Sequence, residues 1–424
     1  MTAQAFPTIS VIGLGYIGLP TAAMFASRRH KVIGVDVNAK AVDIINRGQI
    51  HIVEPDLDIA VHSAVQLGYL RATTVPLPAD AFIIAVPTPF KGNDHEPDLR
   101  FVEAASKSIA PVLAAGNLVV LESTSPVGAT EAMAAWLAAA RPDLTFPQTH
   151  GEASDIRIAH CPERVLPGKV MQELVSNDRV VGGMTPRCSS VAIDLYRIFV
   201  KGECHIASSP RLAEMAKLTE NSFRDVNIAF ANELSLICDK LQMDVWELIR
   251  LANRHPRVNI LQPGPGVGGH CIAVDPWFIV SSAPEQAKLI RTARIVNDHK
   301  PEWVLQQVAQ AVESCLAAKP EMRKTDLTIS VYGLAFKPNI DDLRESPAVD
   351  IALNLDRNFA GCLNIVEPFV TELSPKFSRA KLSSFNDAAN ANIHVLLVDH
   401  DAFKNATRPN GMVIDTRGIW TARA

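Results

Sequence analysis

The motif GLGYIG, Gly13 to Gly18, lies between two stretches with the pattern of β-strands. The β-branched run Ile9 to Ile12 precedes it, and a helix of small residues leads from it to KVIGVD, which ends in Asp36. The first glycine permits a tight turn, the second lets a pyrophosphate approach the backbone, and the third lets the helix pack against the strand. Strand, turn, helix and strand in this order predict a dinucleotide cradle.

The acid at the end of the second strand indicates which dinucleotide binds. Asp36 follows Gly18 by 18 residues, about where a carboxylate accepts the ribose hydroxyls. A carboxylate would repel a 2′-phosphate, and Val37 and Asn38 provide no arginine to hold one. The sequence therefore favours NAD over NADP.

Two further apolar runs end in hydroxyl-bearing residues. They are AFIIAVPTP, Ala81 to Pro89, and NLVVLESTSPVG, Asn117 to Gly128. Ligands of doubly wound sheets bind at the carboxyl ends of the strands, where Thr88 and Thr124 would lie. These threonines either touch the cofactor or the reacting group, or only cap the helices that follow.

The last third of the chain repeats the pattern of the first. Leu327 to Leu355 shows strand, turn and helix again, but only Gly333 survives, and Ala335 stands at the second glycine position. We expect a second α/β unit that binds no second dinucleotide. Lys337 could hold a phosphate there, and Arg344 and Glu345 are expected to begin the next helix. The alternative is an ordinary α/β domain with surface charges.

The stretch from Pro210 to Gln242 has no internal glycine or proline and predicts one long helix. Lys217, Asn221 and Arg224 fall on one face of it. We expect no carboxylate to be spaced to neutralise both cations, so the stripe suits an anion or an oxyanion. The alternative is a solvated face. The helix is otherwise apolar on its other faces and is expected to be buried.

A glycine-rich loop, GPGVGGHCIAVDPW, runs from Gly264 to Trp277 around a single cysteine. Glycines let the backbone come close to a ligand, which a buried structural Cys271 would not need. A thiol near a hydride acceptor suggests oxidation of an aldehyde through a hemithioacetal and a thioester. Asp275 would orient a water or pair with Lys217. A dyad with His270 is disfavoured, because adjacent side chains in an extended loop point apart.

Composition excludes several other classes of protein. The net charge of −4 argues against a nucleic-acid partner. The seven cysteines are scattered and form no C-x-x-C pair, which argues against disulfides or a metal site and for a cytoplasmic protein. Glycines and Pro20 interrupt the apolar run Ile9 to Ala26, so no membrane insertion is expected. Cys161 is expected to be a buried packing residue.

The chain also resembles the UDP-sugar 6-dehydrogenases, the UDP-glucose/UDP-mannuronate dehydrogenase family. The likeness covers nearly the whole chain and is strongest in ISVIGLGYIGLPTA, AVPTPFKG, ESTSPVG, CPERVLPG, KLTENSFRDVNIAFANELS, ANRHPRVNILQPGPGVGGHCIAVDPWF and GLAFKPNIDDLRESPA. It implies two Rossmann-like parallel-sheet domains joined by a central helical domain. We expect an NAD-binding domain at 1–209, a central helical dimerisation domain at 210–315 and a UDP-sugar-binding domain at 316–424.

The resemblance also implies a reaction and a homodimer. The C6 alcohol of a UDP-sugar becomes a carboxylate while two NAD are reduced. The form GGHC points to N-acetylated sugars, first among them UDP-N-acetyl-D-mannosamine, for a bacterial surface polysaccharide of the enterobacterial common antigen type. UDP-N-acetylglucosamine and UDP-glucose remain alternatives.

Roles for individual residues follow from the same resemblance. The implied catalytic residues are Cys271 as nucleophile, with Lys217, Asn221, Asp275, Glu163 and Thr124. NAD would be bound by Gly13, Gly15, Tyr16, Ile17, Gly18, Asp36, Thr88, Thr130 and Arg344. The UDP-sugar would be bound by Arg164, Val165, Lys217, Asn221, Arg224, His255, Arg257, Gly268, Phe336 and Lys337.

Two other functions fit part of the sequence. A two-electron β-hydroxyacid dehydrogenase shares the cradle and a helical middle, but it has no use for Cys271. An NAD-sensing regulator would bind NAD without turnover, and it needs neither the glycine-rich loop nor the Lys217 stripe.

Overall fold

The computed structural model describes residues 6–92, 95–269 and 271–420. The chain forms two compact units, Met1–Glu220 with Trp277–Pro284, and Asn221–Pro276 with Glu285–Ala424. Each unit is built on one sheet of mostly or wholly parallel strands, which confirms the predicted α/β class. The finer division at residues 209 and 315 stays a prediction.

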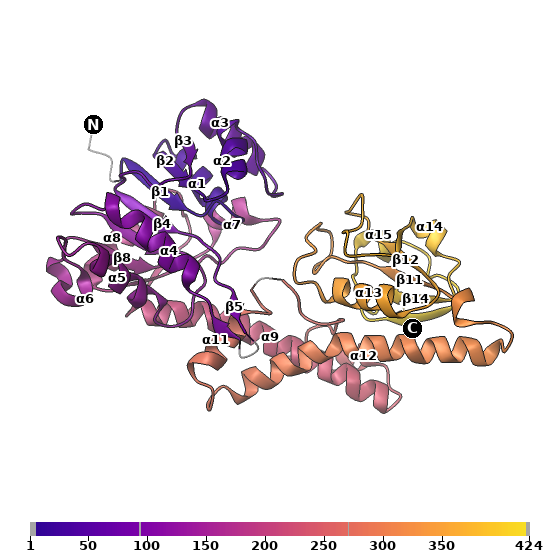
Figure 1. Ribbon diagram of the computed structural model, residues 1–424. Coiled ribbons are helices and arrows are strands. Elements are labelled where there is room, and N and C mark those ends of the chain that lie inside the picture. Colours follow the sequence, from indigo (N-terminus) through magenta and orange to yellow (C-terminus); the bar gives the residue numbers. More distant parts are fainter. Residues whose placement is uncertain (1–5, 93–94, 270, 421–424) are drawn as a thin grey trace. The chain divides into compact units, whose positions relative to one another are not determined.

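The first unit contains an eight-stranded sheet in the order β10-β9-β8-β7-β4-β1-β2-β3 (Figure 1). Neighbouring strands are parallel except β8 and β9, which are antiparallel. The strands are β1 (Thr8–Ile12), β2 (Lys31–Val35), β3 (Leu70–Thr73), β4 (Ala81–Ile84), β7 (Leu118–Leu121), β8 (Arg157–His160), β9 (Arg179–Gly183) and β10 (Cys204–Ala207). A separate short hairpin pairs β5 (Phe90–Lys91) with β6 (Glu96–Pro97).

Helices cover both faces of this sheet, which is why its central strands are apolar throughout. All residues of β4 and β7 are buried, as expected for parallel strands between two layers of helices. Two separate apolar clusters, one on each face, form the core. The helices are α1 (Gly18–Ser27), α2 (Ala39–Asn46), α3 (Leu57–Gln66), α4 (Arg100–Ile109), α5 (Ala129–Ala140), α6 (Pro147–His150), α7 (Val170–Ser176) and α8 (Pro186–Tyr196).

The apolar run Ile9 to Ala26 belongs to this core. It forms β1, the glycine turn and most of α1, and nearly every residue of α1 is buried. No helix in the part of the chain that the structure describes is both long and apolar enough to cross a bilayer.

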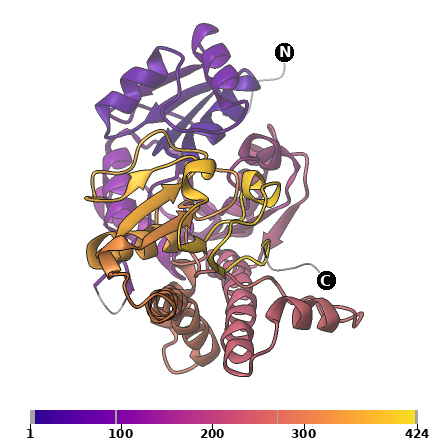
Figure 2. The ribbon, with the colours of Figure 1, turned by 90° about the vertical axis from the view of Figure 1, so that its right-hand side faces the viewer.

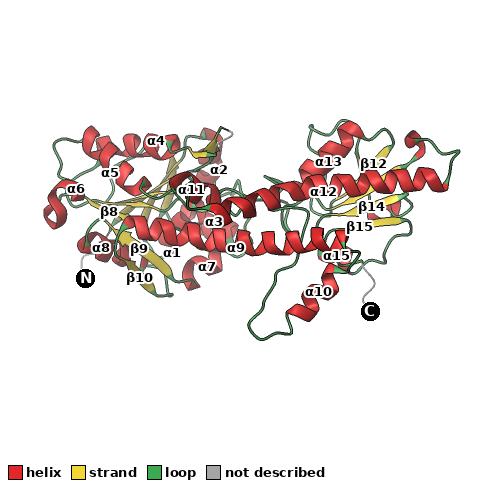
Figure 3. Cartoon of the chain, turned by 90° about the horizontal axis from the view of Figure 1, so that it is seen from below, coloured by secondary structure: helices red, strands yellow, loops and turns green. Residues whose placement is uncertain are grey.

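Two long helices run alongside each other in Figure 3. They are α9 (Pro210–Lys240), which confirms the long helix predicted from the sequence, and α12 (Lys288–Ala318). Buried polar contacts join them, among them Asn232 with Asn297 at 2.8 Å and Lys300 with Ser235 at 2.8 Å. The shorter α10 (Val245–Ala252) and α11 (Asp275–Ser282) lie between them in the sequence.

The second unit contains a wholly parallel five-stranded sheet in the order β13-β12-β11-β14-β15. Figure 2 shows this sheet beside α12, which is seen nearly end-on. Apolar residues of α12, such as Val304 and Val308, pack against the sheet in one buried cluster. The strands are β11 (Thr328–Tyr332), β12 (Cys362–Val366), β13 (Lys381–Leu382), β14 (Ile393–Leu396) and β15 (Met412–Asp415), and the helices are α13 (Pro347–Asn358), α14 (Phe385–Ala388) and α15 (Asp401–Lys404).

Two expectations about the helices were wrong. Arg344 and Glu345 do not begin a helix, because α13 starts at Pro347 and Glu345 has a φ of 48°. The apolar residues of α9 are not all buried: Phe223 is 70% exposed and Phe230 is 52% exposed. A helical wheel shows which residues are apolar, but it cannot show which of them the rest of the fold covers.

Candidate active site

The turn after β1 has the geometry of a pyrophosphate cradle. Gly13 has a φ of 92°, and a Cβ on it would lie 2.4 Å from the carbonyl oxygen of Ala85. A Cβ on Gly18 would lie 1.8 Å from the Gly13 oxygen, so the helix packs as closely as glycine allows. Gly15 has no heavy atom within 4 Å of the corresponding point. Of the three glycines of this turn, only Gly15 therefore leaves space for a ligand to approach the backbone.

The groups around this turn fit NAD. Asp36, at the end of β2, accepts hydrogen bonds from the N–H of Leu14 at 2.9 Å and of Asn38 at 2.8 Å, which hold its carboxylate beside the turn. No side chain caps α1 at Ile17, so the positive end of the helix can face an anion. Tyr16, on the same turn, is half-buried.

The structure brings Thr88 and Thr124 together. They follow β4 and β7, which are neighbours in the sheet, and the Thr88 hydroxyl donates to the Thr124 carbonyl oxygen at 2.5 Å. Thr130 lies elsewhere. It is fully buried, and its hydroxyl donates to Glu214 at 2.6 Å. Its contact with the cofactor stays a prediction.

Glu214 is a polar anchor that sequence reasoning missed. It lies on α9, is fully buried, and accepts the N–H groups of Gly128 at 2.6 Å and Thr130 at 2.8 Å. Burial raises the pKa of this carboxyl, although these hydrogen bonds offset part of the rise. Only contacts between distant segments reveal its role, because an acid in the first turns of a helix is common.

The loop after β8 places an acid near the predicted lysine. Glu163 is 7% exposed and accepts the N–H of Val165 at 2.7 Å. The ammonium of Lys217, also buried, lies 3.9 Å from the Glu163 carboxylate. Arg164 forms an ion pair with Glu220 at 2.7 Å. Glu163 is therefore an acidic neighbour of Lys217 that comes from a segment far away in the sequence. Glu220, on α9 itself, lies three residues after Lys217 and four before Arg224, so the expectation that no carboxylate is spaced to reach both cations was wrong.

A fully buried polar cluster lies at the ends of β7 and β8. The carboxyl of Glu122 accepts hydrogen bonds from Tyr196 at 3.1 Å and Thr21 at 3.2 Å, and Arg179 lies 3.5 Å away. Burial raises the pKa of Glu122 to about 7, although Arg179 pulls it down. Burial also raises the pKa of Cys161 to about 12. This agrees with the packing role expected of Cys161 and not with a second nucleophile.

The second unit carries the thiol. Cys271 is exposed, and its carbonyl oxygen accepts the N–H of Asp275 at 2.8 Å, which starts α11. Asp275 is buried, and its carboxylate accepts a hydrogen bond from the Asn221 amide at 2.5 Å. The structure thus joins two of the predicted catalytic residues directly. His270 lies outside the described residues.

Glycine is required at several points of the loop before Cys271. A Cβ on Gly268 would lie 2.4 Å from the carbonyl oxygen of Glu345, and Gly269 has a φ of 85°. The Gly269 N–H also donates to the same oxygen at 3.2 Å. Within this unit, the loop therefore lies directly against the turn that follows β11.

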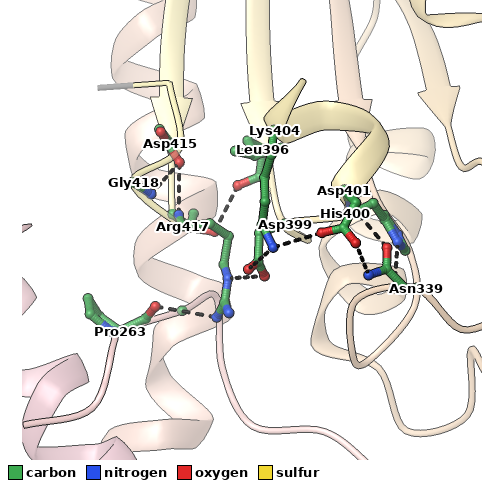
Figure 4. Close-up of polar contacts among 12 residues, drawn as sticks. Pro263, Asn339, Leu396, Asp399, His400, Asp401, Lys404, Asp415, Arg417 and Gly418 are labelled. Atoms are coloured by element: carbon green, nitrogen blue, oxygen red, sulfur yellow. Dashed lines mark hydrogen bonds and ion pairs between the residues drawn. The ribbon is translucent and has the colours of Figure 1, made fainter. Parts of the chain in front are cut away.

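A cavity of about 50 Å³ marks the place where the loop, the turn and the last strand meet. Gly266, Phe336, Pro347 and Arg417 are among the residues that line it. Arg417 follows β15, donates to Asp399 at 2.8 Å and to the Pro263 oxygen at 3.4 Å (Figure 4). Sequence reasoning missed Arg417, although a basic residue just after a parallel strand was a usable signal.

Hydrogen bonds to residues after β14 hold the turn that bears Phe336 and Lys337. Asn339 has a φ of 63°, its N–H donates to His400 at 3.0 Å, and its amide donates to Asp401 at 2.8 Å (Figure 4). Burial alone would raise the pKa of Glu367, but His400, 3.1 Å away, and the N–H of Leu334 lower it below its usual value. The acid after β12 therefore stabilises the turn.

The other predicted cations are not gathered at this cavity. Arg344 pairs with Asp342 at 2.6 Å, while Arg224, His255 and Arg257 are exposed. None of these four lines the cavity among the residues that the structure describes. Their contacts with ligands stay predictions.

The chain matches one protein family along most of its length. Residues 7–200 match the NAD binding domain of the UDP-glucose/GDP-mannose dehydrogenase family, residues 211–299 its central domain, and residues 330–422 its UDP binding domain. The chain belongs to this family. It is an NAD-dependent oxidoreductase, as the cradle after β1 and the acid after β2 indicate.

Three individual proteins show which members of the family this chain is similar to. A UDP-N-acetyl-D-mannosamine dehydrogenase of Yersinia pestis is 66% identical over 98% of this chain and 100% of its own length. An NDP-N-acetyl-D-galactosaminuronic acid dehydrogenase of Ralstonia nicotianae is 61% identical over 99% of this chain and 97% of its own. Among solved structures, a UDP-D-ManNAc dehydrogenase from Pyrococcus horikoshii has a TM-score of 0.84 and 38% identity, and the match covers 97% of this chain and 96% of that one.

Proposed function

We propose that the chain is a UDP-N-acetyl-D-mannosamine dehydrogenase that oxidises the C6 alcohol of the sugar to a carboxylate. The observation that carries this proposal is the exposed thiol of Cys271 at the end of a glycine-rich loop, in a chain with an NAD-binding domain. Oxidation of an alcohol only to an aldehyde or ketone needs no thiol, whereas oxidation to the acid gains from a covalent intermediate. The 66% identity to the enzyme of Yersinia pestis supports the choice of sugar.

The first unit binds the cofactor in this proposal. Gly13 and Gly18 shape the turn, the open side of Gly15 admits the pyrophosphate, and Asp36 accepts the ribose hydroxyls. NAD, when bound, supplies the hydride acceptor for both oxidations. One sugar therefore consumes two NAD and one water, and it yields one carboxylate, two NADH and protons.

The second unit supplies the nucleophile. The Cys271 thiolate adds to the C6 aldehyde, and a C–S bond forms. The former carbonyl oxygen then carries the negative charge or, once protonated, becomes a hydroxyl group. After the second oxidation C6 is a thioester. Water then attacks this carbon, the C–S bond breaks, and the thiolate leaves the carboxylate product. Asp275, held by Asn221, is the acid placed one helical turn after the thiol, and we assign it to the water.

Lys217 is the group assigned to the oxyanions of these steps. Its ammonium is buried beside Glu163, and burial strengthens its electrostatic effect on a developing negative charge. We assign the uridine and diphosphate to the turn that bears Phe336 and Lys337, beside the small cavity that Arg417 also lines. Arg164 and Val165, on the loop after β8, are assigned to the sugar.

A second sugar has specific support. The relative from Ralstonia nicotianae, an NDP-N-acetyl-D-galactosaminuronic acid dehydrogenase, is 61% identical. N-acetylmannosamine and N-acetylgalactosamine share the N-acetyl group at C2 but differ in configuration at C2 and C4. Such a difference is decided by a few side chains, so a nucleotide-linked N-acetylgalactosamine is the second candidate substrate.

We also propose that the protein is a cytoplasmic homodimer. Phe223, Phe230 and Ile237 lie seven residues apart on α9 and are 70%, 52% and 43% exposed. Seven residues are nearly two helical turns, so these side chains form one apolar stripe. An exposed stripe of large apolar residues favours contact with a second copy.

The uronate would serve a surface polysaccharide, as in the enterobacterial common antigen.

The test is a panel of UDP-sugars assayed for NADH and for uronate. We expect the fastest turnover with UDP-N-acetyl-D-mannosamine and two NADH per sugar. UDP-N-acetylgalactosamine, UDP-N-acetylglucosamine and UDP-glucose complete the panel. One NADH per sugar would indicate a two-electron dehydrogenase, and NAD binding without turnover of any sugar would indicate a sensor.

Replacement of the thiol tests the mechanism. Cys271→Ser should lower uronate formation on the order of a thousandfold or more, because serine forms no comparable thioester. Cys362→Ser is the matched control, because Cys362 is also exposed but lies on β12. Uronate formation at the wild-type rate by Cys271→Ser would contradict the covalent mechanism.

A further inference from the structure

Helix α9 holds both ends of the loop that carries Cys271. Near the end of this loop, the Asn221 amide donates to Asp275 at 2.5 Å. At its start, the Gly264 N–H donates to the side-chain oxygen of Asn232 at 2.9 Å. Positions 221 and 232 are separated by three helical turns to within about 20°. The two asparagines therefore lie on one face of α9, and the loop passes from one to the other.

The orientation of the Asn232 side chain is fixed by its partners. The N–H of Gly264 can only donate, so Asn232 must present its oxygen there. Its amide nitrogen then donates to the Asn297 oxygen at 2.8 Å, and the Asn297 nitrogen donates to Asp225 at 2.8 Å. Arg294 donates to the same oxygen of Asp225 at 2.8 Å. The four side chains form a continuous chain of hydrogen bonds that ends at the loop.

This chain of hydrogen bonds is shielded from water. Asn232 and Asp225 are 0% exposed, Asn297 is 1% exposed and Arg294 is 2% exposed. Gly264 is also buried. A buried N–H group without an acceptor is costly, and in a low-dielectric interior each hydrogen bond is stronger than in water. The start of the loop is therefore attached firmly, although its own residues contribute little rigidity.

The composition of the loop explains why an attachment is needed. Gly264, Gly266, Gly268 and Gly269 allow the close contacts described above, but glycine has the largest backbone freedom of any residue. A loop of this kind loses more conformational entropy on ordering than an ordinary one. The reacting sulfur must nevertheless be held within a fraction of an ångström to act efficiently.

We propose that Asn232 is a positioning residue for Cys271. By binding Gly264 it fixes the start of the loop, while Asn221 fixes the end, so that one rigid helix determines where the thiol lies. The inference rests on the proposed function, since it takes Cys271 as the nucleophile. It assigns Asn232 no contact with substrate or cofactor.

The test compares three variants of the full-length protein. Asn232→Leu removes the acceptor for Gly264, and Asn232→Asp keeps that acceptor but loses the bond to Asn297. Ser235→Ala is the matched control. Ser235 is buried one turn further along α9, accepts a hydrogen bond from Lys300 at 2.8 Å and donates one to the backbone oxygen of Asn232 at 2.6 Å. Its replacement therefore weakens the same helix pair but removes no contact between the Asn232 side chain and the loop.

The first readout is kinetic. We expect Asn232→Leu to lower kcat by about 10- to 100-fold with the KM for NAD changed by less than about twofold, because the cofactor cradle is untouched. Asn232→Asp should recover most of this loss, and Ser235→Ala should leave kcat within about twofold of wild type. Equal losses in Asn232→Leu and Ser235→Ala would show a merely structural role and overturn the proposal.

The second readout needs no substrate. Alkylation of Cys271 by iodoacetamide, followed by peptide mass spectrometry from pH 6 to pH 10, should change its pH profile in Asn232→Leu. Cys362 in the same digest is the internal control. An unchanged Cys271 profile in Asn232→Leu would overturn the proposal.

Hydrogen exchange of the wild-type protein covers the case in which Asn232→Leu does not fold. The Gly264 amide should exchange at least about 100-fold more slowly than an open loop amide, and fast exchange would overturn the proposal. Because alkylation and exchange use no sugar, their failure counts against the positioning role alone. Failure of the wild-type enzyme to oxidise any UDP-sugar counts against the proposed function.

Discussion

Gly15 and Gly18 lie three residues apart, yet a methyl group added at each would meet different surroundings. At Gly15 nothing lies within 4 Å of the added carbon, whereas at Gly18 the Gly13 oxygen would be 1.8 Å away. The sequence motif assigns the two glycines different roles, the approach of a pyrophosphate at Gly15 and the packing of helix against strand at Gly18. The geometry separates a glycine that leaves room for a ligand from one that lets the protein pack against itself.

Alanine substitutions should separate these two roles. Gly15→Ala should fold with nearly unchanged stability but raise the KM for NAD about 10-fold or more, or ~1.4 kcal/mol in binding, because the methyl group occupies the approach of the pyrophosphate. Gly18→Ala should lower the thermal midpoint or prevent folding, because backbone must move. The measurements are thermal unfolding and NAD-dependent kinetics. An equal loss of stability in both variants would contradict this division.

At the same scale, the role of a residue could be predicted where its partner is near in the sequence, or where a ligand requires a certain residue type at a certain position. Asp36 could be assigned because the acid lies at a set distance from the glycine turn. Glu214 and Arg417 could not, because their partners lie in distant segments. The proximity of Glu163 to Lys217 belongs to the same class, since it depends on how a loop after β8 meets α9.

Helix α9 is the element on which most of the proposed chemistry depends. One face bears Asn221 and Asn232, which hold the two ends of the Cys271 loop. Another face bears Phe223, Phe230 and Ile237, all exposed in a single chain. The sequence predicted the length of the helix correctly, but it predicted burial for apolar side chains that are exposed in this chain.

Disruption of the apolar stripe should dissociate the proposed dimer. Phe230→Asp places a charge in the stripe and should shift the mass in sedimentation velocity from about twice 46.0 kDa to 46.0 kDa. Phe101→Asp is the matched control, because Phe101 is 46% exposed but lies on α4 and does not belong to the stripe. A wild-type protein that already sediments as a monomer would contradict the dimer.

At the scale of the whole molecule, two α/β sheets differ in what their first turn can bind. The turn after β1 keeps all three glycines, whereas the turn after β11 keeps Gly333, with a φ of 89°. The acid after β12, Glu367, accepts the N–H of Leu334 at 2.7 Å and lies 3.1 Å from His400. Asp36 supports its own turn in the same way, through the N–H of Leu14 at 2.9 Å, but Glu367 is engaged by His400 as well.

Titration with NAD should reflect this difference. Calorimetry of the wild-type protein should give one NAD per chain. The turn after β1 leaves space at its second glycine, Gly15, whereas the turn after β11 has Ala335 at the corresponding position. Asp36→Ala should weaken this single site about 10-fold or more, while Glu367→Ala should lower stability and leave the affinity for NAD within about twofold. Two sites per chain would contradict the assignment.

The sequence by itself determined the two α/β units, the long helix, the NAD cradle and the glycine-rich loop around Cys271. Each of these depends on local patterns, such as strand periodicity, glycine spacing and the absence of helix breakers, which act over a few residues. Only the tertiary structure decided that Glu163 faces Lys217 and that Glu214 binds Thr130. It also decided which side chains bind Asp225 and how the Cys271 loop is attached. Those contacts join residues tens of positions apart, so their geometry depends on the packing of whole elements and no local pattern encodes it.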